Sequence, residues 1–327
     1  MKKLEIGIIG GAGYTAGELI RLLLHHQETN INFVYSTSNA GNKLYKVHQD
    51  LIGDTEINFT SKINTDIDVL FLCLGHGNSI AFLEKTAFSD HTKIIDLSND
   101  FRLLADKNFK GKEFIYGLPE LNKEAIKKAK NIANPGCFAT ALQLAILPLA
   151  ANGLLQNDVH INAVTGATGA GTSLSSTTHF TYRDNNFSHY KAFNHQHLGE
   201  INQTINLLQT NFNSEINFMP NRGNFSRGIF ATIYTKFDGS IEDAKKIYQE
   251  FYKEAAFTFV SDTDVHLKQV VNTNKCILGL EKHGNNLLIT STIDNLLKGA
   301  SGAAIQNMNL MSGFEETLGL NLKANFF

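Results

Sequence analysis

Cysteine is scarce in this chain of 327 residues, and the three that occur, Cys73, Cys137 and Cys276, never form a C-x-x-C pair. An odd count without paired spacing indicates neither a disulfide framework nor a zinc site. No apolar run is long enough to predict a span through a bilayer. The opening residues Met1–Lys3 pass at once into a strand pattern and a glycine loop, unlike a signal peptide. These absences favour a cytoplasmic protein without a membrane partner.

The chain also lacks an excess of positive charge. It has 29 lysine and arginine residues against 31 acidic ones, a formal net charge of −2, and no basic run. We therefore expect no nucleic-acid partner. A length of 327 residues with 43% hydrophobic composition is enough for large buried cores and predicts two domains.

A glycine loop lies near the start of the chain. The apolar run Leu4–Ile9 predicts a strand, the segment Gly10–Gly17 follows it, and an apolar stripe through Leu19–Leu24 predicts a helix. Strand, glycine loop and helix in this order are typical of a dinucleotide site, where the loop approaches the pyrophosphate and the helix start supplies N–H donors. A glycine-rich turn without a ligand is the alternative interpretation. The predicted cofactor-binding residues are Gly10, Gly11, Ala12, Gly13, Tyr14, Thr15 and Ala16.

The end of the second predicted strand, Ile31–Tyr35, bears on the choice of cofactor. It continues into Ser36, Thr37 and Ser38 with no acidic residue, and Lys43 follows. A site that prefers NAD usually has a carboxylate here for the ribose 2′-hydroxyl. Hydroxyls and a lysine suit a 2′-phosphate better, so we expect NADP(H). The alternative is that these residues only cap a turn.

Further apolar strands at Val69–Leu74 and Ile94–Leu97 alternate with helical segments. This alternation predicts a Rossmann-type α/β domain with a doubly wound parallel sheet. Gly75 ends one of these strands, and the segment Asp96–Arg102 ends the other. Because ligands bind at the carboxyl ends of such strands, both ends are candidate binding loops.

Cys137 follows Asn134-Pro135-Gly136, and an apolar helical run starts directly after it. The unpaired N–H groups at a helix start favour an anion, so we expect the pKa of this thiol to be lowered. The same N–H groups can receive an oxyanion. A small buried cysteine that packs a turn is the plainer alternative.

The second half of the chain predicts an α+β domain with a mainly antiparallel sheet. It holds His195 and His197 in a His-x-His pair, but no third metal ligand at a clear spacing, so we expect no metal. A histidine that acts as acid or base beside a cysteine nucleophile fits better, with the other histidine as a structural residue. A long helix is predicted from Asp294 onward.

Arg102 and Arg227 follow strand-like segments, and arginine suits the bidentate binding of phosphate and carboxylate. Solvated surface arginines are the alternative. Gly166–Gly171 is a loop of small residues that would let a substrate approach the backbone.

Together these motifs resemble the N-acetyl-γ-glutamyl-phosphate reductase family of arginine biosynthesis, which is related to aspartate-semialdehyde dehydrogenase. The resemblance covers nearly the whole chain, and the blocks around Cys137 and in the C-terminal segment are the most specific. The segments that carry it are Gly10–Leu19, Asp96–Leu103, Tyr116–Leu121, Asn134–Thr140, Gly166–Gly171, His195–Ile201, Arg227–Tyr234 and Asp294–Leu310.

The resemblance implies specific roles. Cys137 would be the nucleophile and His195 the acid/base, and Gly75 and Asn295 would join the cofactor site. Residues 1–138 with a C-terminal helix at 298–327 would form the NADP-binding domain, residues 139–297 the catalytic and oligomerisation domain, and the protein a dimer or tetramer. The implied substrate-binding residues are Ser98, Arg102, Asn134, Gly166, Glu200 and Arg227.

The sequence departs from the family pattern in three ways. The family commonly has a glycine followed by His-Arg-His, where this chain has Asn194 before the histidine pair and Gln196 within it. It also often has an arginine after the second strand, where this chain has Thr37, Ser38 and Lys43. Arg222, five positions before Arg227, is a rival for the substrate role.

The implied reaction is reduction by NADPH of an acyl phosphate, through a thioester on Cys137, to a semialdehyde and phosphate. The same chemistry on an N-succinyl-glutamyl, aminoadipyl or aspartyl phosphate is an alternative. A non-catalytic protein that senses NADP is a second one.

Overall fold

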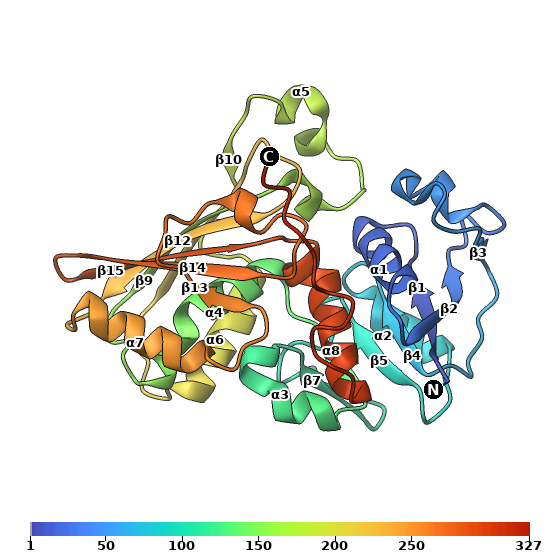
Figure 1. The fold of residues 1–327 in the computed structure, drawn as a ribbon, viewed down its shortest axis with the longest axis horizontal. Helices are drawn as coiled ribbons and strands as arrows, with labels where there is room; N and C mark the ends of the chain where they lie inside the picture. The colour runs from blue at the N-terminus through green and yellow to red at the C-terminus, as the bar shows by residue number, and fades with distance from the viewer. Residues whose placement is uncertain (1) are drawn as a thin grey trace. The chain divides into compact units, whose positions relative to one another are not determined.

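The computed structural model describes residues 2–327, which form two compact units (Figure 1). The first unit comprises the chain up to Gly136 together with Ala300–Asn321, and the second comprises Cys137–Gly299 together with Leu322–Phe327. The chain thus passes between units directly before Cys137 rather than after residue 138. The segment Leu322–Phe327 belongs to the second unit, whereas the sequence placed it in the first.

An eight-stranded sheet forms the first unit, in the order β3-β2-β1-β4-β5-β8-β7-β6. All neighbours pair in parallel except β6 and β7. The strand order reverses between β1 and β4, which is where doubly wound sheets bind ligands. The strands are β1 Leu4–Ile9, β2 Thr29–Tyr35, β3 Phe59–Thr60, β4 Val69–Leu72, β5 Lys93–Asp96, β6 Asn108–Phe109, β7 Lys112–Tyr116 and β8 Asn131–Ala133.

Helix α1 packs its apolar stripe on this sheet, against β2. In α1, Leu19, Ile20, Leu22 and Leu23 are buried, as a helix with one core-facing side requires. The C-terminal helix α8 packs along α3, and Figure 1 shows the two as a red helix beside a green one. Helix α8 also contacts α1. The helices are α1 Tyr14–Leu24, α2 Asn78–Lys85, α3 Pro119–Lys128 and α8 Gly302–Ser312.

A seven-stranded mixed sheet forms the second unit, in the order β10-β11-β9-β12-β15-β14-β13. The pairs β11–β9 and β13–β14 are parallel and the other four are antiparallel. The predicted fold class, a doubly wound nucleotide domain plus a mainly antiparallel α+β domain, is confirmed. The strands are β9 Val159–Thr165, β10 Ser188–His189, β11 Ile216–Arg222, β12 Ile229–Lys236, β13 Thr258–Val260, β14 Cys276–His283 and β15 Asn286–Ile293.

Helix α4, Cys137–Ala151, is the centre of the second unit. Its residues from Phe138 to Ala150 are buried, so the helix is enclosed on all sides rather than along one stripe. It packs against β12, β15, α6 and α7. The other helices of this unit are α5 Phe180–Arg183, α6 His197–Leu208 and α7 Ile241–Tyr252.

Three local predictions differ from the structure. The helix predicted from Asp294 begins only with a π-helical turn at Leu297–Ser301, because the Asp294 carboxylate accepts the N–H groups of Leu296 and Leu297 and holds a turn there. The residues from Ile241 to Ala256 also predict one helix, whereas the observed helix α7 ends earlier, at Tyr252. Cys73 lies just beyond β4 instead of inside it.

Candidate active site

The glycine loop of the first unit shows three different uses of glycine. Gly10 has a φ of +79°, and a Cβ there would lie 2.6 Å from the Cys73 carbonyl oxygen. A Cβ on Gly11 would lie 2.3 Å from Val34 Cγ1, so this residue is needed for packing. Gly13 has nothing within 4 Å of such a Cβ, and it precedes α1 without any side-chain cap. Open space at uncapped N–H groups fits a pyrophosphate.

His48 supports this loop, and the sequence did not point to it. Its Nε2 atom lies 2.7 Å from the Gly11 carbonyl oxygen, and a Cβ on Gly17 would lie 2.6 Å from its Nδ1 atom. The imidazole therefore holds the glycine loop through this hydrogen bond, and it leaves no room for a side chain at position 17. Only the fold brings together residues 37 positions apart, so no local pattern could reveal the contact.

The hydroxyl residues after β2 form a small cluster. Ser36 Oγ and Ser38 Oγ lie 3.4 Å apart, and Asn39 Nδ2 donates to both at 3.3 and 3.1 Å. Thr37 beside them is exposed. Lys43, expected to add charge here, instead pairs with Glu56 at 2.9 Å and donates to its carbonyl oxygen at 2.7 Å. Neutralisation by Glu56 weakens Lys43 as a phosphate ligand.

The loops after β4 and β5 are tied to one another. Asp100 accepts the N–H groups of Gly77, Ser79 and Ile80, which caps the start of α2 just beyond Gly75. Ser98 is fully buried and donates to Asp96 at 2.7 Å. These contacts favour a structural part for Ser98, and its role as a substrate ligand stays a prediction.

Arg102 and Asn134 hold the turn that leads to Cys137. Arg102 is 5% exposed, and it donates from Nε to the Asn134 carbonyl oxygen at 2.8 Å and from Nη2 to the Leu97 carbonyl oxygen at 3.0 Å. The Asn134 side chain donates to the Ala300 carbonyl oxygen at 3.1 Å and accepts from Asn307 at 3.1 Å. Both residues predicted to bind substrate therefore fix the backbone just before Cys137.

Cys137 is the first residue of α4 and is partly exposed. Gly299 packs directly against it: a Cβ at position 299 would lie 2.7 Å from Cys137 Cβ and 3.1 Å from its Cα. No local pattern in the sequence indicates a role for this glycine. Of the other two cysteines, Cys276 is buried in β14. Desolvation, together with the charge of Asp96, raises the pKa of the Cys73 thiol. Cys73 is therefore a poor nucleophile.

Aromatic side chains place the histidines beside the start of α4. The Phe138 ring lies 5.5 Å from the His195 ring and 6.3 Å from the His197 ring. The two imidazoles are 4.6 Å apart, and Phe218 of β11 lies 5.5 Å from His195. The second unit therefore brings Cys137 and His195, the predicted catalytic pair, to one end of α4, together with His197.

His195 is 5% exposed, and burial followed by the positive charge of Lys191 lowers its pKa to about 4. Its Nδ1 atom accepts the N–H of His197 at 3.2 Å. A neutral ring that accepts at Nδ1 carries its proton on Nε2. At neutral pH, His195 therefore offers an N–H donor at Nε2.

Arg227 is committed to Asp294. Its Nε and Nη2 atoms bind the two carboxylate oxygens at 2.9 and 3.1 Å, and Asp294 is fully buried. Asn295, predicted to touch the cofactor, accepts the Gly228 N–H at 2.6 Å and donates to Thr168 at 3.1 Å. These bonds join the loop before β12 to the turn after β15, and the predicted ligand roles of both residues stay untested.

The two remaining predicted substrate residues also lie in the second unit. Gly166 packs on the backbone of Ser226 and Arg227, where a Cβ would come within 2.6 Å. Glu200 is 3% exposed in α6. Close backbone approach explains the glycine, and the substrate-binding roles of both residues stay predictions.

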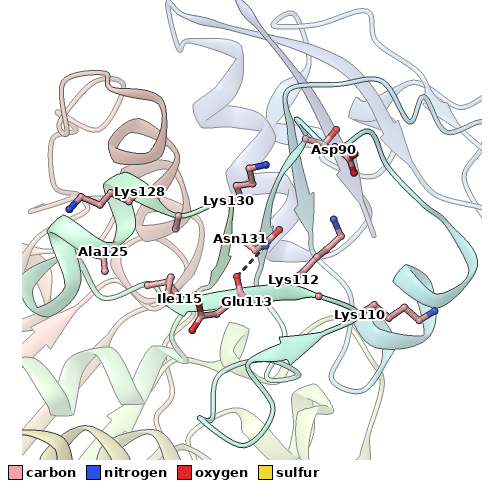
Figure 2. A pocket seen from close by; sticks show the side chains of 12 residues that line it. Asp90, Lys110, Lys112, Glu113, Ile115, Ala125, Lys128, Lys130 and Asn131 are labelled. Carbon is pink, nitrogen blue, oxygen red and sulfur yellow. Dashed lines mark hydrogen bonds between the residues drawn. The ribbon is translucent and has the colours of Figure 1, made fainter.

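One hollow, of 660 Å³, contains none of the predicted site residues. It lies in the first unit beside β7 and β8 and is lined by lysines and by Glu113, whose carbonyl oxygen accepts from Asn131 (Figure 2). Residues 2–327 hold no group of three or more His, Cys, Asp or Glu side chains placed to bind a metal. Within the same range, no helix is long and apolar enough to cross a membrane.

Two family models match the chain. A semialdehyde dehydrogenase NAD binding domain matches residues 5–129, and a semialdehyde dehydrogenase dimerisation domain matches residues 137–295. The first contains the glycine loop and the second contains Cys137 and His195.

Relatives match almost the full length of this chain, and two of them illustrate the match. An N-acetyl-gamma-glutamyl-phosphate reductase from Christiangramia forsetii is 71% identical over 99% of this chain and 100% of that protein. The protein of the same name from Flavobacterium johnsoniae is 63% identical over 99% of this chain and 100% of its own length. Among solved structures, aspartate semialdehyde dehydrogenase II of Vibrio cholerae has a TM-score of 0.74 at 14% identity, with 96% of this chain and 99% of that chain covered. That likeness supports the fold.

Proposed function

The chain belongs to the N-acetyl-gamma-glutamyl-phosphate reductase family, and from this we propose that it reduces N-acetyl-γ-glutamyl phosphate to N-acetylglutamate semialdehyde in arginine biosynthesis. It is an oxidoreductase with an NAD-binding domain. The observation that carries the proposal is the position of Cys137 as the first residue of the buried helix α4, with His195 held against the neighbouring Phe138.

Cys137 performs the covalent step in this proposal. Its thiolate attacks the γ-acyl carbon, the carbon–sulfur bond forms, and the bond to the phosphate oxygen breaks with release of phosphate. A nicotinamide cofactor held at the glycine loop would supply the hydride that reduces the thioester carbon. The carbon–sulfur bond then breaks, which releases the semialdehyde and restores the thiolate.

The backbone at the start of α4 supports both charged states of this sequence. N–H groups of a first helical turn have no partner inside the helix and carry the positive end of its dipole. They stabilise the thiolate before attack and the oxyanion of each tetrahedral intermediate after it. Arg102, Asn134 and Gly299 fix the backbone on which these donors depend.

His195 acts through its Nε2–H in this proposal. Because Nδ1 is held by the His197 N–H, the ring donates from Nε2 and resists a second proton. A neutral N–H donor suits the stabilisation, by a hydrogen bond, of the thiolate and of the oxyanion, while its proton stays on Nε2.

NADP(H) is the proposed cofactor. Gly10–Ala16 would hold the pyrophosphate, and Ser36, Thr37 and Ser38 the 2′-phosphate. Support comes from the hydroxyl cluster after β2, which contains no carboxylate. Because Lys43 is paired with Glu56, we expect moderate discrimination, about tenfold to a thousandfold in kcat/KM.

An assay of the reverse reaction tests the proposal. The purified protein is given phosphate, NADP and N-acetylglutamate semialdehyde, and the appearance of NADPH is followed. Parallel reactions with the N-succinylglutamate, aminoadipate and aspartate semialdehydes compare acyl groups. If turnover is fastest with another semialdehyde, that compound becomes the assigned substrate. If the protein binds cofactor but turns over none of them, a non-catalytic role is favoured.

Substitution tests the two catalytic residues. Cys137→Ser should lose several orders of magnitude in kcat while it still binds cofactor. His195→Asn should lose about 10²- to 10⁴-fold, the usual contribution of general acid–base catalysis. His197→Asn is the matched control and should lose clearly less; a larger loss there would exchange the two assignments.

Cofactor preference is tested at position 37. Thr37→Asp should repel a 2′-phosphate and offer an acceptor to a ribose hydroxyl, which lowers the ratio of kcat/KM for NADPH over NADH. A wild-type ratio at or below one would contradict the preference for NADP.

A further inference from the structure

A second arginine of the catalytic unit lies closer to the histidine than the sequence indicated. Arg222 is the last residue of β11, and its guanidinium carbon lies 4.9 Å from the centre of the Tyr190 ring. The Tyr190 ring in turn lies 5.8 Å from the His195 ring. Arg222, Tyr190 and His195 thus form one connected group of side chains.

The register of β11 places this group on the face of the sheet that carries the catalytic helix. Side chains alternate along a strand, so Phe218, Pro220 and Arg222 share one face. Phe218 on that face lies 5.2 Å from the Phe138 ring and 5.5 Å from His195. Met219, on the opposite face, is 41% exposed. Arg222 therefore lies on the Cys137 side of the sheet, at the open end of β11.

The hydrogen bonding of Arg222 is incomplete. Among residues 2–327, its Nε atom is buried without a hydrogen-bond partner, which is costly for a charged donor. Desolvation, followed by the charge of Cys137, raises the pKa of Tyr190, while Arg222 lowers it. Tyr190 therefore stays a neutral phenol that positions Arg222 and cannot balance its charge. Arg227, by contrast, is already bound by both oxygens of Asp294.

We propose that Arg222, held over the Tyr190 ring, binds an oxyanion of the substrate, either its phosphate or its carboxylate, beside Cys137. The ligand completes the hydrogen bonding of the guanidinium and orients the acyl carbon toward the sulfur. This assignment rests on the proposed function and makes Arg222, rather than Arg227, the substrate arginine nearest to the catalytic pair. Planar bidentate pairing also explains why arginine is used there rather than lysine.

Protection of Cys137 from alkylation tests the site without turnover. Iodoacetamide labelling of Cys137 is measured by peptide mass spectrometry at increasing inorganic phosphate and, separately, N-acetylglutamate. At least one probe should slow the labelling in the wild type. In Arg222→Gln, the concentration that gives half protection should rise about tenfold to a hundredfold. Equal protection in both proteins, or none in the wild type, would overturn the proposal.

Kinetics then identify the oxyanion. In the reverse reaction, Arg222→Gln should raise KM for phosphate if it binds the phosphate, or KM for the semialdehyde if it binds the carboxylate, with KM for NADP unchanged. Arg222→Lys keeps the positive charge but lacks the planar guanidinium, so its KM for the affected substrate should lie between those of the wild type and Arg222→Gln. The matched control is Arg183→Gln, which should leave both substrate KM values unchanged. The Arg183 guanidinium also lies over a tyrosine ring, 5.8 Å from the centre of Tyr182. Its Nε and Nη1 atoms are likewise buried without a hydrogen-bond partner among residues 2–327, but it belongs to α5 rather than to the strand that carries Phe218.

The outcomes separate this assignment from the proposed function. No reductase turnover, with protection of Cys137 that still depends on Arg222, would reject the proposed reaction alone. Normal turnover, with neither substrate KM changed in Arg222→Gln, would reject Arg222 alone.

Discussion

The chemistry of the candidate site depends on single residues whose surroundings change their ordinary behaviour. Cys137 and Cys73 are both thiols near the end of a strand or the start of a helix, but only Cys137 opens a helix. Desolvation and Asp96 raise the pKa of Cys73, so its thiolate is rare at neutral pH. Iodoacetamide should therefore label Cys137 ahead of the other two, which makes the protection assay selective.

His195 should remain neutral at pH values well below the usual pKa of a histidine side chain. Burial lowers its pKa to about 4, whereas the unfolded chain has the ordinary value of about 6.5. The folded pKa is the lower one, so the stabilisation from this residue is complete above about pH 6.5 and is lost as the pH falls through 4. Titration of the ring followed by NMR, with His195→Asn to assign the signal, measures this. A midpoint near 6.5 would contradict the buried, neutral ring.

Gly299 should be needed for the geometry of Cys137. In Gly299→Ala the new methyl group would lie 2.7 Å from Cys137 Cβ and 3.1 Å from Cys137 Cα. Because these atoms belong to the backbone or lie next to it, the cysteine must move. Misplacement of a reacting group by about 1 Å can cost about 10²-fold in rate. We expect kcat to fall by that order with KM for NADPH unchanged. Full activity in Gly299→Ala would show that the start of α4 tolerates the shift.

At the scale of elements, α4 contains an unusual interior proline. Pro148 has no N–H, so the Leu144 carbonyl oxygen four residues earlier loses its helical donor. The Tyr252 hydroxyl from α7 donates to that carbonyl oxygen, and Tyr248 donates to Ala145 one position on. Helix α7 thus replaces a hydrogen bond that the helix sequence of α4 removes.

Tyr252→Phe should therefore destabilise the second unit. The substitution keeps the ring but leaves the Leu144 carbonyl oxygen without that donor, which costs about 1–3 kcal/mol. Thermal or urea unfolding of the full chain measures the change in free energy. The control is Tyr182→Phe, because Tyr182 is 42% exposed and should be nearly neutral. A loss of stability equal to that of the control would remove Tyr252 from this role.

Local patterns predicted the elements of the site better than they predicted its contacts. The glycine loop, β1 and α1, and the helix start at Cys137 are visible in the sequence because glycine spacing and apolar periodicity are local properties. The partners of Arg102, Ser98 and Arg227 are not, because each is fixed by residues brought together only by the fold. Hence three predicted ligands turn out to hold backbone or carboxylate groups, and His48, Tyr190 and Gly299 passed unnoticed.

At the scale of the whole molecule, the sheet of the second unit, as described for residues 2–327, leaves side chains on one face partly or fully exposed along β9 and β12. Helices α4 and α7 pack on the other face, as Figure 1 shows. Along β9 and β12 the side chains alternate between buried and partly or fully exposed. On the exposed face, Met219 is 41% and Tyr234 is 45% exposed, and together with Phe193 and Leu288 they line a hollow of 280 Å³.

A second copy of the chain is the expected cover for this face, because the segment that forms it matches a semialdehyde dehydrogenase dimerisation domain. A single chain has a mass of 36.1 kDa, and light scattering should give twice that value or more. Tyr234→Glu places a charge among apolar side chains, which is unfavourable when the face is covered, and should lower the mass at micromolar concentration. Phe180→Glu is the control, because Phe180 is 74% exposed on α5, away from β9 and β12 in the sequence, and should leave the mass unchanged. If Tyr234→Glu assembles like the wild type, the copies associate through some other surface.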